Sequence, residues 1–220
     1  MYMYFCETSH RKKMTSSEFC PEDRIYPSDN NFEIPCLRLD RQPKSGLLLP
    51  FAGWGSDARV RTTVSTYHFY VDDYRFSAIW KHPQRVLSGG CRELVEPNFS
   101  LFDTTPIAYG LQLIYKKRWI ARFWQECGAV VYADLNVSKK FAEYNRLGIP
   151  DGYNAFATRG YADREEYLRE EIKIAQEISG LDVPNMIVYG GGENIRQICL
   201  QAKVLYVEQF MTNRRKGGVE

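Results

Sequence analysis

The sequence lacks most of the features that assign a chain to a protein class at once. Its six cysteines are scattered without a Cys-x-x-Cys pair, and its three histidines have no zinc-ligand spacing, so neither a disulfide scaffold nor a zinc site is indicated. No apolar run reaches the roughly 18 residues of a membrane-spanning helix, so we expect no membrane partner. A P-loop and a Gly-x-Gly-x-x-Gly motif are also missing, which removes the two commonest phosphate-loop signatures.

An excess of charge of one sign is missing too. The 220 residues contain 29 Lys and Arg against 27 Asp and Glu, a net charge of +2, which neither requires nor excludes a nucleic-acid partner. A hydrophobic fraction of 44% and a charged fraction of 25% are typical of one ordinary globular domain. We predict a poorly ordered arm at 1–30, a single domain at 31–210 and a flexible basic tail at 211–220. Scattered cysteines favour reduced thiols in a cytoplasmic protein.

The sequence does contain a regular alternation of short apolar runs and helical patterns. The long pattern from Pro106 to Cys127 has a proline at its start and Gly128 as its stop. The predicted strands are Thr63–Val71, Arg92–Val95, Ala129–Ala133, Tyr153–Thr158, Met186–Tyr189 and Val204–Val207. The predicted helices are Tyr74–Lys81, Pro106–Cys127, Lys139–Leu147, Asp163–Ser179 and Glu193–Cys199. This order predicts one α/β domain, with a mostly parallel sheet or a partial β/α barrel joined by helical crossovers.

Polar residues recur where the predicted strands end. Asp72-Asp73, Glu96, Asp134 and Arg159 each follow an apolar run, and Gly190–Gly192 follows another. Because parallel strands end at the same edge of a sheet, these residues should lie along one rim. Ligands bind at that rim in open α/β sheets and in barrels. We read the glycines as a tight turn.

The carboxylates at these strand ends are candidate metal ligands. Asp72, Asp73, Glu96 and Asp134 could together hold Mg²⁺ or Mn²⁺, which take oxygen ligands and often a phosphate. The candidate catalytic residues are His68, Asp72, Asp73 and Arg159. His68 would carry a proton, and Arg159 would grip a phosphate. The alternative is that these are helix caps, solvated charges and a half-buried histidine.

A second candidate site lies on the long helix, where basic and aromatic residues alternate. Such a surface can bind nucleic acid through phosphate contacts and base stacking. Its members are Tyr115, Lys116, Arg118, Trp119 and Arg122. The alternative reading is that Trp119 widens the buried stripe of the helix while the cations face solvent.

The segment His68-Phe69-Tyr70-Val71-Asp72-Asp73-Tyr74-Arg75-Phe76, followed by Trp80 and Pro83, resembles a motif of an uncharacterised family. This family is catalogued as domain of unknown function 4417 and is found in phages, prophages and plasmids. Pro97–Leu101, Gly148–Pro150 and Val188–Gly190 match it in the same order. The family usually has Asp at the position of Asn98, so a ligand role there would fall to Glu96 or be lost. The resemblance implies a mobile-element protein in a bacterial cytoplasm and no established activity.

These observations leave two hypotheses of nearly equal weight and a third, in which the arm and the basic tail are regulatory and the core is a scaffold. The first is a divalent-metal-dependent hydrolase or phosphotransfer protein that acts on a nucleotide or nucleic acid. The second is a non-catalytic protein that binds a host protein or DNA through the aromatic and basic surface of the long helix. The first requires the strand-end side chains to converge, and the second requires the helix surface to be exposed.

Overall fold

The computed structural model describes residues 24–44, 46–55 and 66–209. Its strands form one seven-stranded sheet in which each strand pairs in parallel with the next strand of the chain. The strands are β1 (Phe51–Gly53), β2 (Thr66–His68), β3 (Glu93–Val95), β4 (Val130–Asp134), β5 (Phe156–Arg159), β6 (Met186–Tyr189) and β7 (Leu205–Val207). A sheet whose strands follow the chain order winds in one direction, as a barrel does.

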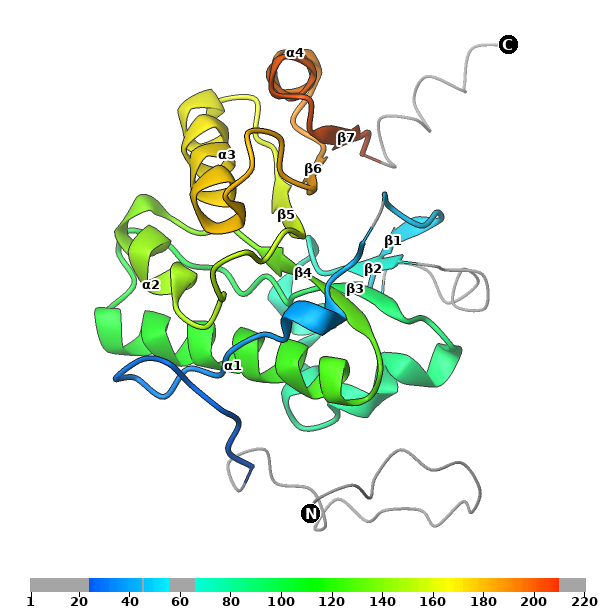
Figure 1. The fold of residues 1–220 in the computed structure, drawn as a ribbon, viewed down its shortest axis with the longest axis vertical. Coiled ribbons are helices and arrows are strands. Elements are labelled where there is room, and N and C mark those ends of the chain that lie inside the picture. Colours follow the sequence, from blue (N-terminus) through cyan, green and yellow to red (C-terminus); the bar gives the residue numbers. More distant parts are fainter. Residues whose placement is uncertain (1–23, 45, 56–65, 210–220) are drawn as a thin grey trace.

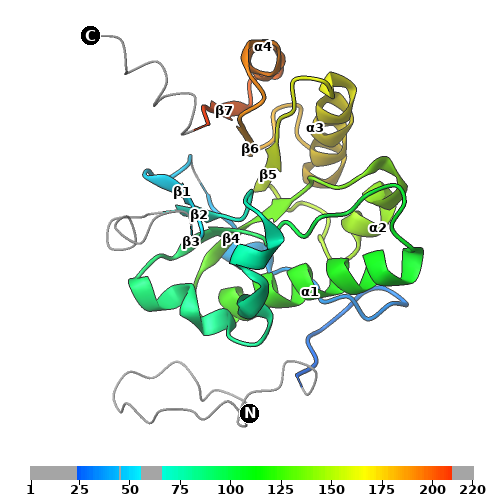
Figure 2. The same ribbon diagram turned by 180° about the vertical axis from the view of Figure 1, so that it is seen from behind.

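The sheet curls, and the helices cover its outer side. The helices are α1 (Ile107–Glu126), α2 (Ala142–Arg146), α3 (Glu165–Ser179) and α4 (Glu193–Ala202). Figures 1 and 2 show the strands in an arc from β1 to β7, with α1, α2 and α3 outside it. The predicted fold class, a single α/β domain with a parallel sheet or partial barrel, is confirmed. No described helix is long and apolar enough to cross a membrane.

Successive side chains at the end of β2 point alternately to the outer and the inner face of the curled sheet. The ring of Phe69, just after β2, stacks on Trp124 of α1 with 5.5 Å between ring centroids, on the outer side. His68 points the other way, and its ring lies 4.4 Å from Tyr189 of β6 and 4.5 Å from Phe51 of β1. Phe51 and Tyr189 also touch each other. Aromatic side chains from β1, β2 and β6 therefore fill the inside of the curl.

Two predicted elements differ from the structure. The weakly alternating segment Phe32–Asp40, whose pattern predicts at most an edge strand interrupted by Pro35, is irregular and ends in a 3-10 turn, Leu39–Arg41. Its backbone groups bond to loops and side chains instead, since Leu37 N donates to Gly148 O (2.8 Å) and Arg38 N donates to Gln125 Oε1 (2.7 Å). The predicted helix Tyr74–Lys81 is a pair of 3-10 turns.

The sequence pattern also missed β1, and the structure describes residues 24–30 of the predicted arm. The prolines and glycines around Leu47–Phe51 predict an ordered loop, yet Phe51–Gly53 pairs with β2. Residues 24–30 pack on α1, because Tyr26 is buried and Trp119 Nε1 donates to Arg24 O (2.8 Å). The remainder of the predicted arm, the whole predicted basic tail and the first part of the strand predicted at Thr63–Val71 lie outside the described residues.

Candidate functional site

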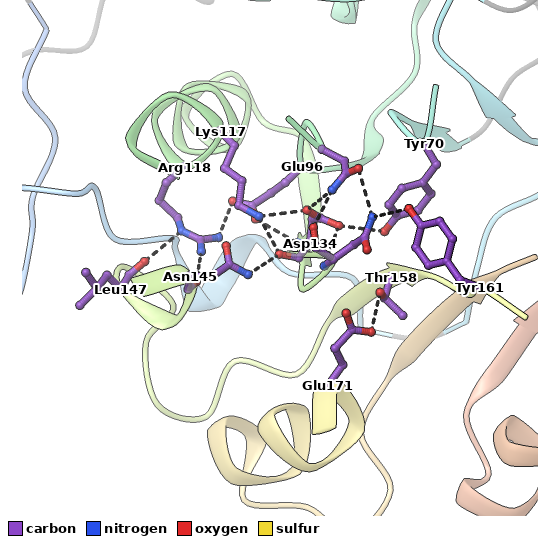
Figure 3. Close-up of polar contacts among 12 residues, drawn as sticks. Tyr70, Glu96, Lys117, Arg118, Asp134, Asn145, Leu147, Thr158, Tyr161 and Glu171 are labelled. Carbon is purple, nitrogen blue, oxygen red and sulfur yellow. Dashed lines mark hydrogen bonds and ion pairs between the residues drawn. The ribbon is translucent and has the colours of Figure 1, made fainter. Parts of the chain in front are cut away.

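Buried charge is concentrated at the carboxyl ends of β3 and β4. Glu96 follows β3 and Asp134 ends β4. Figure 3 shows these two carboxyl groups close together, with Lys117 and Arg118 reaching them from α1. We call Glu96, Asn98, Lys117, Arg118 and Asp134 the rim network.

The first ion pair of the rim network joins Arg118 to Glu96. Both side chains are fully buried, and Arg118 Nη1 bonds to Glu96 Oε1. The second oxygen, Glu96 Oε2, accepts a hydrogen bond from the backbone N–H of Asp134 (2.9 Å). Arg118 also donates to the carbonyl oxygens of Asn145 (2.7 Å) and Leu147 (3.2 Å). Because each charge has several partners, the pair can remain ionised without water.

The second ion pair joins Lys117 to Asp134. Lys117 Nζ lies 2.9 Å from Asp134 Oδ2, which also accepts from Asn98 Nδ2 (3.0 Å). Asp134 Oδ1 accepts from the Tyr70 hydroxyl (3.1 Å) and from the backbone N–H of Asn136 (3.2 Å). Burial raises the pKa of Asp134, and the charge of Lys117 opposes that shift. Asn98 therefore has a donor role that an ionised Asp at its position would lack.

A pocket opens beside the rim network, at the ends of β4 and β5. Its volume is about 90 Å³. We call it the rim pocket. Its lining residues are Asn98, Phe99, Ser100, Leu101, Phe102, Asn136, Val137, Ser138, Arg159, Gly160, Tyr161, Arg164, Tyr167, Leu168 and Glu171.

Cations and aromatic rings alternate along one wall of the rim pocket. The guanidinium groups of Arg159 and Arg164 lie 5.3 Å and 5.1 Å from the ring centroid of Tyr161. Arg164 also lies 5.9 Å from the ring of Tyr167, and Lys139 Nζ lies 5.1 Å from the same ring. Cation–ring contacts hold the arginines in place while leaving N–H groups for a ligand. The wall is therefore suited to an anion.

Glu171 supplies a buried carboxyl group to the same pocket. It projects from α3, is 8% exposed and accepts a hydrogen bond from Thr158 Oγ1 of β5 (2.7 Å). Burial raises the pKa of Glu171 well above its usual value, and the nearby charge of Asp134 raises it further. This residue was not predicted from the sequence. The available signal was a carboxylate within the apolar stripe formed by Leu168, Ile172 and Ala175.

The predicted metal ligands do not meet in one place. The Asp72 side chain is 70% exposed and forms an ion pair with Arg75 (3.7 Å). Asp73 accepts hydrogen bonds from the backbone N–H and the hydroxyl of Ser100 (both 3.0 Å). Both oxygens of Glu96 and both of Asp134 are bonded within the rim network. In the parts of the chain that the structure describes, no three His, Cys, Asp or Glu side chains form a metal-binding group. These four carboxylates thus do not fit a shared Mg²⁺ or Mn²⁺ ion.

His68 is placed inside the curl rather than at the rim. Its Nδ1 accepts the backbone N–H of Tyr70 (3.2 Å), and its ring stacks with Tyr70 at 5.4 Å. Burial, with a smaller contribution from the charge of Arg159, lowers the pKa of His68 to about 3. A neutral histidine at pH 7 is not a ready proton carrier, so the geometry does not favour the predicted catalytic role.

The aromatic and basic residues of α1 do not form an exposed surface. Trp119 and Arg118 are completely buried, and Arg122 pairs with Glu126 (2.8 Å). Lys116 lies over the Trp80 ring at 5.4 Å, and Tyr115 is partly buried beside the same ring. The helix uses this face to pack on the sheet and on residues 24–44. Trp119 thus widens the buried stripe, as the alternative reading predicts, but Arg118 is buried rather than facing solvent.

The fold and this pocket define a parallel α/β half-barrel protein with a polar site at the carboxyl ends of its strands. The family model described as "Domain of unknown function (DUF4417)" matches residues 26–177. The chain belongs to this family, as the motif from His68 to Phe76 indicates. The matched residues include the rim network and the whole rim pocket.

Two curated relatives come from mycobacteriophages. The chain is 33% identical over 111 residues to "Gene 1 protein" of Mycobacterium phage D29, covering 48% of this chain and 40% of the relative. It is 31% identical over 111 residues to "Gene 1 protein" of Mycobacterium phage L5, covering 48% of this chain and 47% of that relative. The match thus spans less than half the length of each relative. The expected phage association is confirmed, and no solved structure matches the chain significantly.

Proposed function

We propose that this chain is an enzyme that binds the phosphate group of a nucleotide or nucleic acid in the rim pocket and hydrolyses or transfers that group. The observation that carries the proposal is the alternating wall of Arg159, Tyr161, Arg164 and Tyr167. Guanidinium groups bind phosphate oxygens with paired hydrogen bonds. Tyrosine rings beside them suit a planar base.

The other lining residues give the pocket neutral hydrogen-bonding groups. Asn98 and Asn136 hold each other through Asn136 Nδ2 and Asn98 Oδ1 (3.2 Å), and Asn136 Nδ2 also donates to the Tyr161 hydroxyl (3.4 Å). Ser138 Oγ is buried and has no hydrogen-bond partner among the described residues. A buried hydroxyl without a partner is costly, so a ligand oxygen that reached Ser138 would remove that cost.

Metal dependence does not follow from this arrangement. The oxygens of Glu96 and Asp134 are bonded to Arg118, Lys117 and neighbouring groups, and drawing them toward an ion would break two buried ion pairs. The proposal therefore assigns phosphate binding to the arginines. We also propose that the protein acts in the cytoplasm of a bacterial host.

The test is a ligand screen on the folded protein. Nucleoside mono-, di- and triphosphates and a short single-stranded oligonucleotide are added with and without Mg²⁺ or Mn²⁺, and thermal unfolding is recorded. A ligand at about 100 times its Kd should stabilise the fold by about 2.7 kcal/mol. Ligands that stabilise are then incubated with the protein, and phosphate products are followed by phosphorus NMR.

The control variants separate the rim pocket from general charge. The double variant Arg159→Gln/Arg164→Gln should lose the stabilisation, whereas Arg169→Gln should keep it, because Arg169 is an exposed arginine of α3 outside the pocket lining. Equal stabilisation of all three proteins would refute the assigned site. Binding without any product would leave a phosphate-binding protein and reject the enzyme.

A further inference from the structure

We propose that Glu171 is a binding residue of the rim pocket that donates a hydrogen bond from its carboxyl group to the bound phosphate, and that ionisation of this carboxyl expels the phosphate. The inference rests on the proposed function. It adds a residue that holds a hydrogen-bonding proton and makes phosphate binding depend on pH.

The position of Glu171 is the first argument. On α3, Leu168, Ile172 and Ala175 are buried against the sheet, and Glu171 lies in the same stripe. An apolar side chain there would pack without the cost of burying a carboxyl group. Glu171 instead reaches the wall of the rim pocket, where Arg159 and Arg164 also lie. Glu171 therefore contributes a carboxyl group to the lining of a pocket that also contains two guanidinium groups.

The hydrogen bonds of Glu171 are the second argument. Thr158 Oγ1 donates to Glu171 Oε2 (2.7 Å), and Figure 3 shows the side chain rising from α3 toward β5. A protonated carboxyl group has one O–H donor besides its acceptor oxygens. Because Thr158 is bonded to Oε2, the proton belongs on Oε1. From there it can be donated to a phosphate oxygen.

The surrounding charges are the third argument. No ion pair involves Glu171 among the residues that the structure describes. Asp134 of β4 and Glu170 of α3 favour its neutral form, whereas the Thr158 hydroxyl and the more distant Lys117 of α1 favour the ionised form. The charge of Glu171 also contributes to raising the pKa of Tyr70, which follows β2. Burial is the largest influence, so the carboxyl stays neutral at a pH where an exposed glutamate is ionised.

A neutral carboxyl and an ionised one act on an anion in opposite ways. The neutral group adds one hydrogen bond to those of the arginines. The ionised group, which is 8% exposed, places a negative charge against the phosphate, and the repulsion is stronger there than in bulk water. If only the neutral form admits the phosphate, Kd rises about tenfold per pH unit above the pKa of Glu171.

The experiment measures binding of the dinucleotide thymidylyl-thymidine by calorimetry between about pH 5.5 and 9. Its single phosphodiester keeps the same charge over that range, so any pH dependence comes from the protein. The wild-type Kd should be constant below the pKa of Glu171 and rise by up to about tenfold per pH unit above it. Glu171→Gln should bind with a Kd that does not change with pH, since the amide keeps an N–H donor.

Glu170→Gln is the matched control. Glu170 is the adjacent residue, but its side chain is 55% exposed and pairs with Lys139 (2.9 Å) on the surface. This variant should keep the fall in affinity with rising pH, displaced slightly to lower pH because Glu170 also favours the neutral form of Glu171. Circular dichroism establishes that each variant is folded. If Glu171→Gln does not fold, infrared spectroscopy of the wild type takes the place of the binding measurement on this variant. The carbonyl band of a protonated carboxyl is then followed with and without the dinucleotide.

The outcomes separate this inference from the proposed function. Identical pH profiles for the wild type and Glu171→Gln would overturn the role of Glu171 and leave phosphate binding intact. Affinity of the wild type that does not vary with pH, or an infrared band that does not shift on binding, would also overturn it. If neither the dinucleotide nor any nucleotide binds the wild type at any pH, the proposed function and this inference both fail.

Discussion

The rim network and the rim pocket lie at the ends of neighbouring strands but satisfy their charges in different ways. In the network, Glu96 and Asp134 are completely buried, and each pairs with a cation from α1. In the pocket, Arg159 is partly exposed and Arg164 is exposed, and both are held by tyrosine rings. The first arrangement is closed to new partners. The second still has donors to offer.

This difference shows that a carboxylate at the end of a parallel strand need not belong to the binding site. Glu96 and Asp134 have the position expected of metal ligands, yet their oxygens hold α1 to β3 and β4. The side chains that remain available come from β5 and the segment after it. We therefore expect substitutions in the network to change stability, and substitutions in the pocket to change binding.

The largest expected effect is on stability, from Glu96→Gln. This change leaves the Arg118 guanidinium buried without a charged partner, which should lower the free energy of unfolding by about 3–5 kcal/mol. Urea unfolding measures the difference. Glu126→Gln is the control, because Glu126 pairs with Arg122 at the surface and such pairs contribute at most about 1 kcal/mol. Equal losses in the two variants would contradict the distinction between buried and exposed pairs.

The next effect is a pH dependence that originates inside the curl. Burial lowers the pKa of His68 to about 3, so the unfolded chain takes up this proton first as pH falls. The stability linked to His68 is complete above about pH 6.5 and is lost as pH falls toward 3, at no more than about 1.4 kcal/mol per pH unit. His68→Gln should remove this slope between about pH 6 and 5 in urea titrations. A variant with the wild-type slope would show that His68 is not buried in its neutral form.

The smallest effect on stability is expected from Arg164→Gln in the rim pocket. Arg164 is exposed and stands over Tyr161 and Tyr167, so its removal should change the free energy of unfolding by no more than about 0.5 kcal/mol. Its effect on phosphate affinity should be larger, roughly tenfold, or about 1.4 kcal/mol. Urea unfolding and calorimetry on the same preparation give both numbers. A large stability loss with unchanged affinity would make Arg164 structural.

Much of the fold could be predicted because the spacing of apolar residues along the chain indicates where the helices and strands lie. Ile107–Glu126 was predicted as Pro106–Cys127, and Glu165–Ser179 as Asp163–Ser179, since apolar residues at helical spacing and terminal glycines mark both. The three-residue strand Phe51–Gly53 carries too short a pattern. It forms because β2 offers it a partner, and a pairing between distant segments leaves no local signal.

The site was predicted only in its location. Strand ends pointed to one rim, and Arg159 does line the rim pocket. Arg164 and Tyr167 were overlooked because a charged residue and a tyrosine at the start of a helix are common on any surface. Glu171 did leave a signal, a carboxylate in an apolar stripe, but its meaning depends on Thr158, which lies 13 residues away in β5.

The sequence by itself determined the alternation of strands and helices, the parallel sheet and the edge where polar residues collect, because these depend on local periodicity and chain order. Only the tertiary structure decided which polar residues are paired with one another in the interior. Lys117 and Arg118 are adjacent on α1, and both reach buried carboxylates, whereas Arg159 and Arg164 do not. Whether a charge is neutralised depends on what the fold places within a few ångströms of it, and that partner is set by long-range packing.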